Sequence, residues 1–285
     1  MDGKQGTYFP LALGPVIIGL RFDQEGYTQA LAEYFSPATP GNAPDVFIDF
    51  TLVDHDDFPD IPQSLIQSKK WTKGTFSIAE NLFRGKSGPT ARTWEIEVKT
   101  IMTKGQITRV FEQFLYQAFY TACSIARKPG ILVHSSCVAV DGRAFLFVGP
   151  SGMGKSTIAE MSRRYEVFND EMNILTPGES GGYLVNPSPF NAYFEGKTAS
   201  SAPLKAIFLL RHADECRIET ISPAMAVAEI TGQVVPPLGL EDAYTQTVAT
   251  RMMEIAFDLT AKVPVRLLYF PREGGFWPLV LDTFR

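Results

Sequence analysis

The chain has 285 residues, 45% of them hydrophobic and 20% charged, which fits a globular protein of one large or two ordinary domains. Lys and Arg total 26 against 31 Asp and Glu, so the net charge of −5 and the absence of a basic run disfavour nucleic acid and membranes as partners. Its three cysteines, Cys123, Cys137 and Cys216, show no paired or metal-ligand spacing, and we expect reduced, mostly buried thiols.

The N-terminal residues 1–23 contain an apolar run that two prolines and two glycines interrupt. The run is too short and too broken to span a bilayer, and it lacks the basic start and small-residue cleavage site of a secretory signal. The sequence therefore predicts a cytoplasmic protein.

Strand patterns dominate up to about residue 105. Residues 45–53 and 93–100 alternate apolar and polar side chains, as half-buried strands do. Segments 36–45 and 83–89 are rich in Gly, Pro and Ser and are interpreted as turns. These patterns predict a small antiparallel β-rich domain.

Residues 106–128 repeat apolar side chains at helical spacing, and Pro129-Gly130 ends the pattern. Such an apolar stripe could bind a partner, but burial against the helix's own domain is the favoured interpretation. The predicted organisation is a smaller β-rich α+β domain over residues 1–128, ending in this amphipathic helix, and a second domain over residues 129–285.

A different pattern starts at residue 131. Two apolar strands, 131–140 and 143–149, flank the hairpin signal Asp141-Gly142. A helix-forming run follows, and residues 165–176 then predict one further strand. A turn at 176–182 leads into a strand at 183–187.

The last third of the chain again mixes strands and helices. Residues 204–210 form a continuous apolar run, typical of a strand buried on both faces. Ser222-Pro223 opens a helix, and a longer helix is predicted at about 240–261. Residues 265–271 and 277–282 predict late strands.

The segment Gly149–Ser156 matches the phosphate-binding pattern G-x-x-x-x-G-K-[ST] in full, between an apolar strand and a helix-forming run. Glycines let successive backbone N–H groups turn around a phosphate, and the helix N-terminus adds positive potential. The candidate nucleotide contacts are Gly149, Pro150, Ser151, Gly152, Met153, Gly154, Lys155, Ser156 and Thr157. A chance glycine-rich turn is the alternative, but the complete motif in this context favours ATP or GTP binding.

Two adjacent acids, Asp170 and Glu171, follow the predicted helix directly. If the strand that bears them lies next to the loop-bearing strand, they come close to Lys155 and Ser156. One carboxylate and the Ser156 hydroxyl would then hold Mg²⁺, and the other carboxylate would accept a proton from an attacking hydroxyl. Both acids can face the site only where the strand ends or bulges, and if one does, Asp170 is favoured. A solvated acidic turn is the alternative.

His134 is the third candidate, because the Asp141-Gly142 hairpin pairs its strand with the loop-bearing strand. It could orient Asp170 or share a proton with it, whereas its position alone favours a structural histidine. His55 and His212 have no comparable sequence context.

Together, "VHSSCVAVDGRAFLFVGPSGMGKSTIAE" and "VFNDEMNIL" resemble the catalytic core of HPr kinase/phosphorylase and its relatives, which share a fold with phosphoenolpyruvate carboxykinase. The resemblance covers residues 131–176 and extends more loosely to about 210. It implies an α/β P-loop kinase core. In that core Asp170 would activate a seryl hydroxyl with help from His134, while Lys155 and Ser156 would hold phosphates and metal.

The chain also departs from HPr kinase. It has Asn169-Asp170-Glu171 where HPr kinases carry Asp-Asp, and it has no Asn-Pro-Gly-Arg-Asn segment downstream. These departures disfavour HPr as the substrate and disfavour phosphorolysis. The chain resembles more closely the HPr-kinase-like proteins whose substrates are not established, some of which modify a serine in a peptide precursor.

The predicted function is an ATP-dependent phosphotransferase that moves the γ-phosphate to a hydroxyl, with a serine of a small protein or peptide as acceptor. ATP or GTP and Mg²⁺ are the expected cofactors, and a homo-oligomer is left open. Two alternatives stay open as well: a small-molecule kinase, and a nucleotide-gated binding protein with little turnover.

Overall fold

The computed structural model describes residues 7–24, 43–53, 68–72, 75–80, 83–87, 92–99, 104–190, 200–236 and 243–284. The chain divides into two compact units, residues 1–128 with 236–250 and residues 129–235 with 251–285. The sequence predicts residues 236–250 as part of the second domain, whereas the structure groups them with the first unit. Among the described residues, no helix is both long and apolar enough to cross a membrane.

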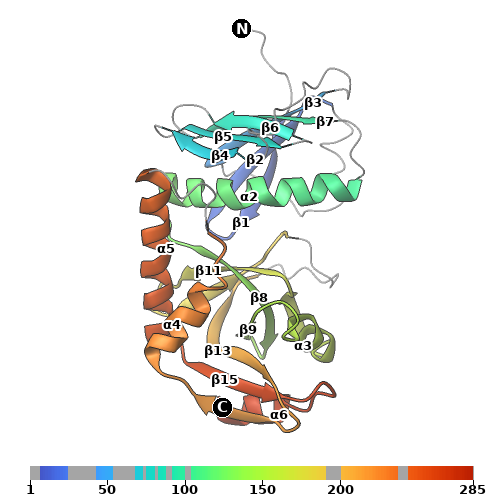
Figure 1. Ribbon diagram of the computed structural model, residues 1–285, viewed down its shortest axis with the longest axis vertical. Coiled ribbons are helices and arrows are strands. Elements are labelled where there is room, and N and C mark those ends of the chain that lie inside the picture. The colour runs from blue at the N-terminus through green and yellow to red at the C-terminus, as the bar shows by residue number, and fades with distance from the viewer. Residues whose placement is uncertain are drawn as a thin grey trace. The chain divides into compact units, whose positions relative to one another are not determined.

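The first unit contains a seven-stranded sheet and one long helix (Figure 1). The elements are β1 (Phe9–Leu13), β2 (Val16–Phe22), β3 (Val46–Val53), β4 (Ser68–Thr72), β5 (Thr75–Glu80), β6 (Phe83–Ser87), β7 (Thr93–Lys99) and α2 (Lys104–Ala126). The strand order is β1-β2-β3-β7-β6-β5-β4. Because β3 pairs in parallel with both β2 and β7, the prediction of an antiparallel domain is wrong. Alternation of side chains shows a strand's faces and says nothing of its partner's direction.

Strand β6 occupies a segment that was predicted to be a turn. Its Gly85 lies opposite Ile96 of β7, and a Cβ atom at Gly85 would clash with the Ile96 side chain. The glycine therefore marks a close approach of two strands.

The core of the first unit follows the predicted alternation. The buried residues of its two central strands are Val46, Ile48, Phe50, Trp94, Ile96 and Val98. Helix α2 packs on β2 and β3, and the Phe114 ring meets the Phe50 ring edge-on at 6.2 Å between centroids.

The second unit contains eight strands and most of the described helices. The strands are β8 (Ile131–Val140), β9 (Arg143–Val148), β10 (Glu166–Asn169), β11 (Met172–Pro177), β12 (Tyr183–Asn186), β13 (Ala202–His212), β14 (Arg217–Thr220) and β15 (Val265–Phe270). The helices are α3 (Lys155–Met161), α4 (Pro223–Thr231), α5 (Ala243–Lys262), which begins in the first unit, and α6 (Trp277–Thr283).

Strand β9 is at the centre of this unit. It pairs antiparallel with β8 through a turn in which Asp141 and Gly142 have φ values of 50° and 71°, as the hairpin signal predicts. On its other edge β9 pairs in parallel with β13, which also pairs in parallel with β15. The interior of β13 is accordingly buried.

Two predictions about this unit are wrong. The strand after α3, β10, pairs with β8 rather than with β9, so that β8 separates β10 from the loop-bearing strand. Residues 277–282 form helix α6 rather than a strand, with Pro278 in the first turn. A short apolar run fits either structure, and Pro in the first turn favours the helix.

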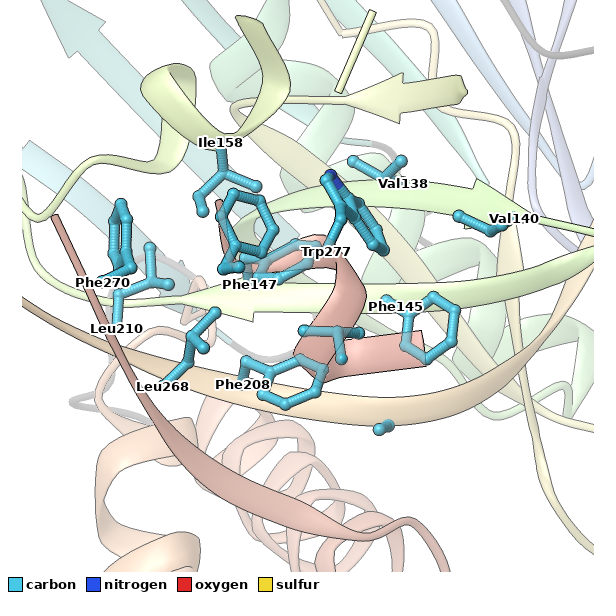
Figure 2. Packing of buried hydrophobic residues seen from close by; sticks show 13 residues of the cluster. Val138, Val140, Phe145, Phe147, Ile158, Phe208, Leu210, Leu268, Phe270 and Trp277 are labelled. Carbon is cyan, nitrogen blue, oxygen red and sulfur yellow. The ribbon is translucent and has the colours of Figure 1, made fainter. Parts of the chain in front are cut away.

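One face of the second unit's sheet packs against α3 and α6 (Figure 2). The cluster comprises Val138, Val140, Phe145, Phe147, Ile158, Ala206, Phe208, Leu210, Leu268, Phe270, Phe276, Trp277 and Val280. Trp277 packs its ring 5.7 Å from Phe147 and donates its indole N–H to Ser162 Oγ at 2.8 Å. Because side chains alternate along strands, His134 of β8 and His212 of β13 belong to this same face.

Replacing Trp277 tests this packing. We expect Trp277→Ala to lower the free energy of unfolding of the second unit by about 3–5 kcal/mol, because it empties a large volume beside α3. Trp277→Phe keeps an aromatic ring and loses the indole hydrogen bond, so we expect the free energy of unfolding to fall by only about 1 kcal/mol. Urea denaturation followed by circular dichroism measures both, and equal losses would contradict the packing described.

Candidate functional site

The phosphate-loop motif connects the end of β9 to the start of α3. Gly152 and Gly154 have φ values of 82° and 95°, a conformation that other residues adopt only at a cost. A Cβ atom at Gly154 would also lie 3.0 Å from Phe270 Cζ. The loop therefore needs glycine at both positions to make its turn.

Lys155 begins α3 and turns back over the loop. Its Nζ donates to the carbonyl oxygen of Gly149 at 2.8 Å and to that of Pro150 at 3.2 Å. Burial lowers the pKa of Lys155, and the negative charge of Glu171 partly offsets this effect. Ser156, the next residue, has an exposed side chain.

His134 lies level with the start of the loop. Strand β8 pairs with β9 so that Ser135 is opposite Val148, the last residue of β9. Where β9 ends, the backbone N–H of His134 donates to the carbonyl of Gln233 at 2.8 Å. The residues after α4 thus continue the pairing that β9 leaves.

Asp170 and Glu171 lie in a break between two strands. Both β10 and β11 pair antiparallel with β8, Asn169 opposite Cys137 and Met172 opposite His134, and the register shifts within β10. The predicted continuous strand is therefore two strands with the acids between them. This is the irregular geometry in which two adjacent side chains need not point to opposite faces.

The side chain of Asn169 holds this break in place. Its Oδ1 accepts the backbone N–H groups of Glu171 at 2.8 Å and Met172 at 2.7 Å. Its Nδ2 donates to the carbonyl of Phe190 at 2.9 Å. The residue is only 3% exposed, so these bonds satisfy groups that water does not reach.

A second buried amide links the break to β8. Asn173 Nδ2 donates to the carbonyl of Ser135 at 2.7 Å and to Ser135 Oγ at 3.0 Å. The Ser135 hydroxyl donates in turn to the carbonyl of Val133 at 3.0 Å. The start of β8 and the acid-bearing strand are therefore joined by side chains as well as by backbone pairing.

His134 and Glu171 form a pair beside the loop, with 3.2 Å between His134 Nε2 and Glu171 Oε1. Hydrogen bonding by His134 lowers the pKa of Glu171, and the charges of His134 and Lys155 act in the same direction against the effect of burial. Glu171 keeps 55% of its side chain exposed, whereas Asp170 is 2% exposed. The structure thus brings His134, Glu171 and Lys155 into one electrostatic group.

His212 is the residue that the sequence interpretation missed. It ends β13 beside the loop, with Nε2 3.3 Å from the carbonyl oxygen of Gly152. The alternation of side chains along the apolar strand could have found it, because Phe208, Leu210 and His212 share one face of β13. His55 lies outside the described residues.

Asn169 is expected to be important for stability. Asn169→Ala leaves two backbone N–H groups and one carbonyl without their partner, and we expect it to cost about 1–3 kcal/mol of unfolding free energy. Asn169→Asp keeps the acceptor for the N–H groups but sets a buried carboxylate oxygen against the Phe190 carbonyl, so at neutral pH it should cost at least as much. Urea denaturation of both variants measures the difference. A harmless Asn169→Ala would contradict the role assigned to the side chain.

The His134–Glu171 pair predicts a pH effect with a defined sign. Because the folded-state pKa of Glu171 is lowered, its stabilising contribution is present above the ordinary carboxyl pKa of 4.5 and is lost as pH falls through the lowered value. A carboxyl ¹³C NMR titration should place Glu171 below 4.5 in the wild type and at higher pH in His134→Ala. An unchanged midpoint would show that the pair does not form in solution.

Among solved structures, the HPr(Ser) kinase/phosphatase from Coxiella burnetii matches at 14% identity over 54% of this chain and 92% of its own, with a TM-score of 0.28. No curated protein matches the chain significantly. The family described as SynChlorMet cassette protein ScmC matches residues 97–284, which include the last three residues of β7, helix α2, the phosphate-loop motif and both acids. This chain belongs to the ScmC family.

Proposed function

We propose that this chain is a phosphotransferase that moves the γ-phosphate of ATP or GTP to a hydroxyl group, with a serine of a small protein or peptide as acceptor. The observation that carries the proposal is that Lys155, at the end of a complete phosphate-loop motif, lies near the His134–Glu171 pair beside the end of β9. The acceptor class rests on the resemblance of residues 131–176 to the HPr-kinase-like core.

Lys155 and the glycine loop would hold the phosphates. The Lys155 ammonium now donates to two carbonyls of its own loop, and phosphate oxygens would replace these acceptors with charged, stronger ones. The positive φ values of Gly152 and Gly154 suit a loop that turns its N–H groups toward an anion.

The residues present also fit Mg²⁺. This ion prefers oxygen ligands and is commonly held by one or two carboxylates together with phosphates and water. The exposed Ser156 hydroxyl and the half-exposed Glu171 carboxylate are the oxygen donors on the loop's side. When bound, the ion would neutralise charge on the β- and γ-phosphate oxygens.

Asp170 is proposed as the proton acceptor. The resemblance of residues 131–176 to the HPr-kinase-like core implies this role for Asp170, while the neighbouring Glu171 is paired with His134. Asp170 would take the proton of the acceptor hydroxyl while its oxygen bonds to the γ-phosphorus. The bond from that phosphorus to the β–γ bridging oxygen breaks, and the nucleoside diphosphate leaves.

Transfer of label from γ-labelled ATP with Mg²⁺ to a lysate of the source cell tests the proposal. We expect a labelled protein or peptide band with the wild type and none with Lys155→Ala, since the cradle would lose its cation. Asp170→Asn should slow labelling by about 10²–10⁴-fold, because a general base contributes that much.

The matched control is Glu160→Gln, an exposed acid of α3 whose loss should leave labelling unchanged. Normal labelling by Asp170→Asn would refute its assignment as proton acceptor. Tight ATP binding that depends on Lys155 but labels no acceptor would instead favour a nucleotide-gated binding protein.

A further inference from the structure

A second histidine, His212, borders the loop on the side opposite the acids. His212 is exposed at the end of β13, its Nε2 is 3.3 Å from the Gly152 carbonyl, and its ring lies 5.9 Å from that of Phe270. A Cβ atom at Gly154 would lie 3.7 Å from His212 Cε1. The imidazole therefore borders the loop at both of its positive-φ glycines.

The strand order places His212 and the two acids on opposite sides of β9. Strand β9 lies between β8, which carries His134 and pairs with the acid-bearing strands, and β13, which carries His212. If transfer takes place at the acids, the γ-phosphate is on the β8 side of the loop. The α-phosphate and the nucleoside then lie away from the acids, and β13 is the neighbour of β9 on that side.

We propose that His212 binds the nucleoside part of the nucleotide, its ribose and base, where this part leaves the loop over the end of β13. The inference rests on the proposed function. An imidazole suits the task because its ring can stack on a base while its nitrogens donate to or accept from a sugar hydroxyl. The neighbouring Arg211 is a poorer candidate for this contact, because its guanidinium already pairs with Glu229 of α4 and donates to the Leu210 carbonyl.

Loss of a contact to the nucleoside should weaken the binding of nucleotides but not the binding of inorganic polyphosphates. Calorimetric titration with Mg²⁺ would compare ATP, GTP and inorganic tripolyphosphate on the wild type, His212→Ala and Lys155→Ala. We expect His212→Ala to weaken ATP or GTP binding about tenfold, the order that loss of one stacking contact gives. Its tripolyphosphate affinity should stay within about twofold of the wild type, because the phosphate cradle is intact. Lys155→Ala should weaken all three ligands.

Two further variants sharpen the test. His212→Phe keeps a ring for stacking and should recover most of the nucleotide affinity if stacking dominates, whereas His212→Asn should do so if the hydrogen bond dominates. Failure of both to exceed His212→Ala would overturn the proposed contact. Circular dichroism melting of each variant checks the fold, which replacement of an exposed side chain should leave unchanged.

Each failure has a distinct signature. Equal weakening of nucleotide and tripolyphosphate by His212→Ala would mean that His212 only shapes the loop, and unchanged binding of every ligand would mean that it touches none. Either result overturns this inference and leaves the proposed function standing. Wild-type protein that binds neither ATP, GTP nor tripolyphosphate overturns the proposed function, and this inference with it.

Discussion

The pairing of β8 on both of its edges determines where His134 and the two acids lie relative to the end of β9. On one edge Ser135 is level with the last residue of β9, and on the other Met172 is level with His134. A slip of one residue on either edge would send His134 to the opposite face of the sheet and separate it from Glu171. Sheet register, rather than the conformation of a surface loop, therefore sets the distance between the acids and the phosphate loop.

The acids need a break in the strand, and a break leaves backbone groups unpaired. Asn169 resolves this conflict, because its amide replaces the missing strand partners of Glu171 and Met172 and also reaches the Phe190 carbonyl. A fully bonded buried amide costs little, whereas each of these backbone groups would be expensive to leave unpaired. The same side chain thus stabilises the fold and fixes the conformation on which the acids depend.

The sequence predicts what is encoded locally and misses what depends on distant pairing. Short patterns predict the strand, glycine turn and helix around residues 149–156, the Asp141-Gly142 hairpin, and the buried faces of β3 and β7. The structure contains each of these local features. The parallel neighbours of β3, the insertion of β8 between β9 and β10, and the position of His212 all depend on which strands meet. The break before Glu171 was foreseen only as a condition, because no residue pattern shows where a bulge forms.

The charges of Lys155, Glu171 and His134 influence one another in the structure without a ligand. Burial disfavours the charge of Lys155, and the nearby carboxylate of Glu171, itself kept ionised by His134, restores part of that loss. A polyphosphate would change this balance, since its charges would favour the Lys155 cation and oppose the Glu171 anion. A divalent cation between carboxylate and phosphates would relieve that repulsion. If the proposed nucleotide binds here, this pairing of one lysine with one half-exposed acid would therefore suit it better with a divalent cation than without one.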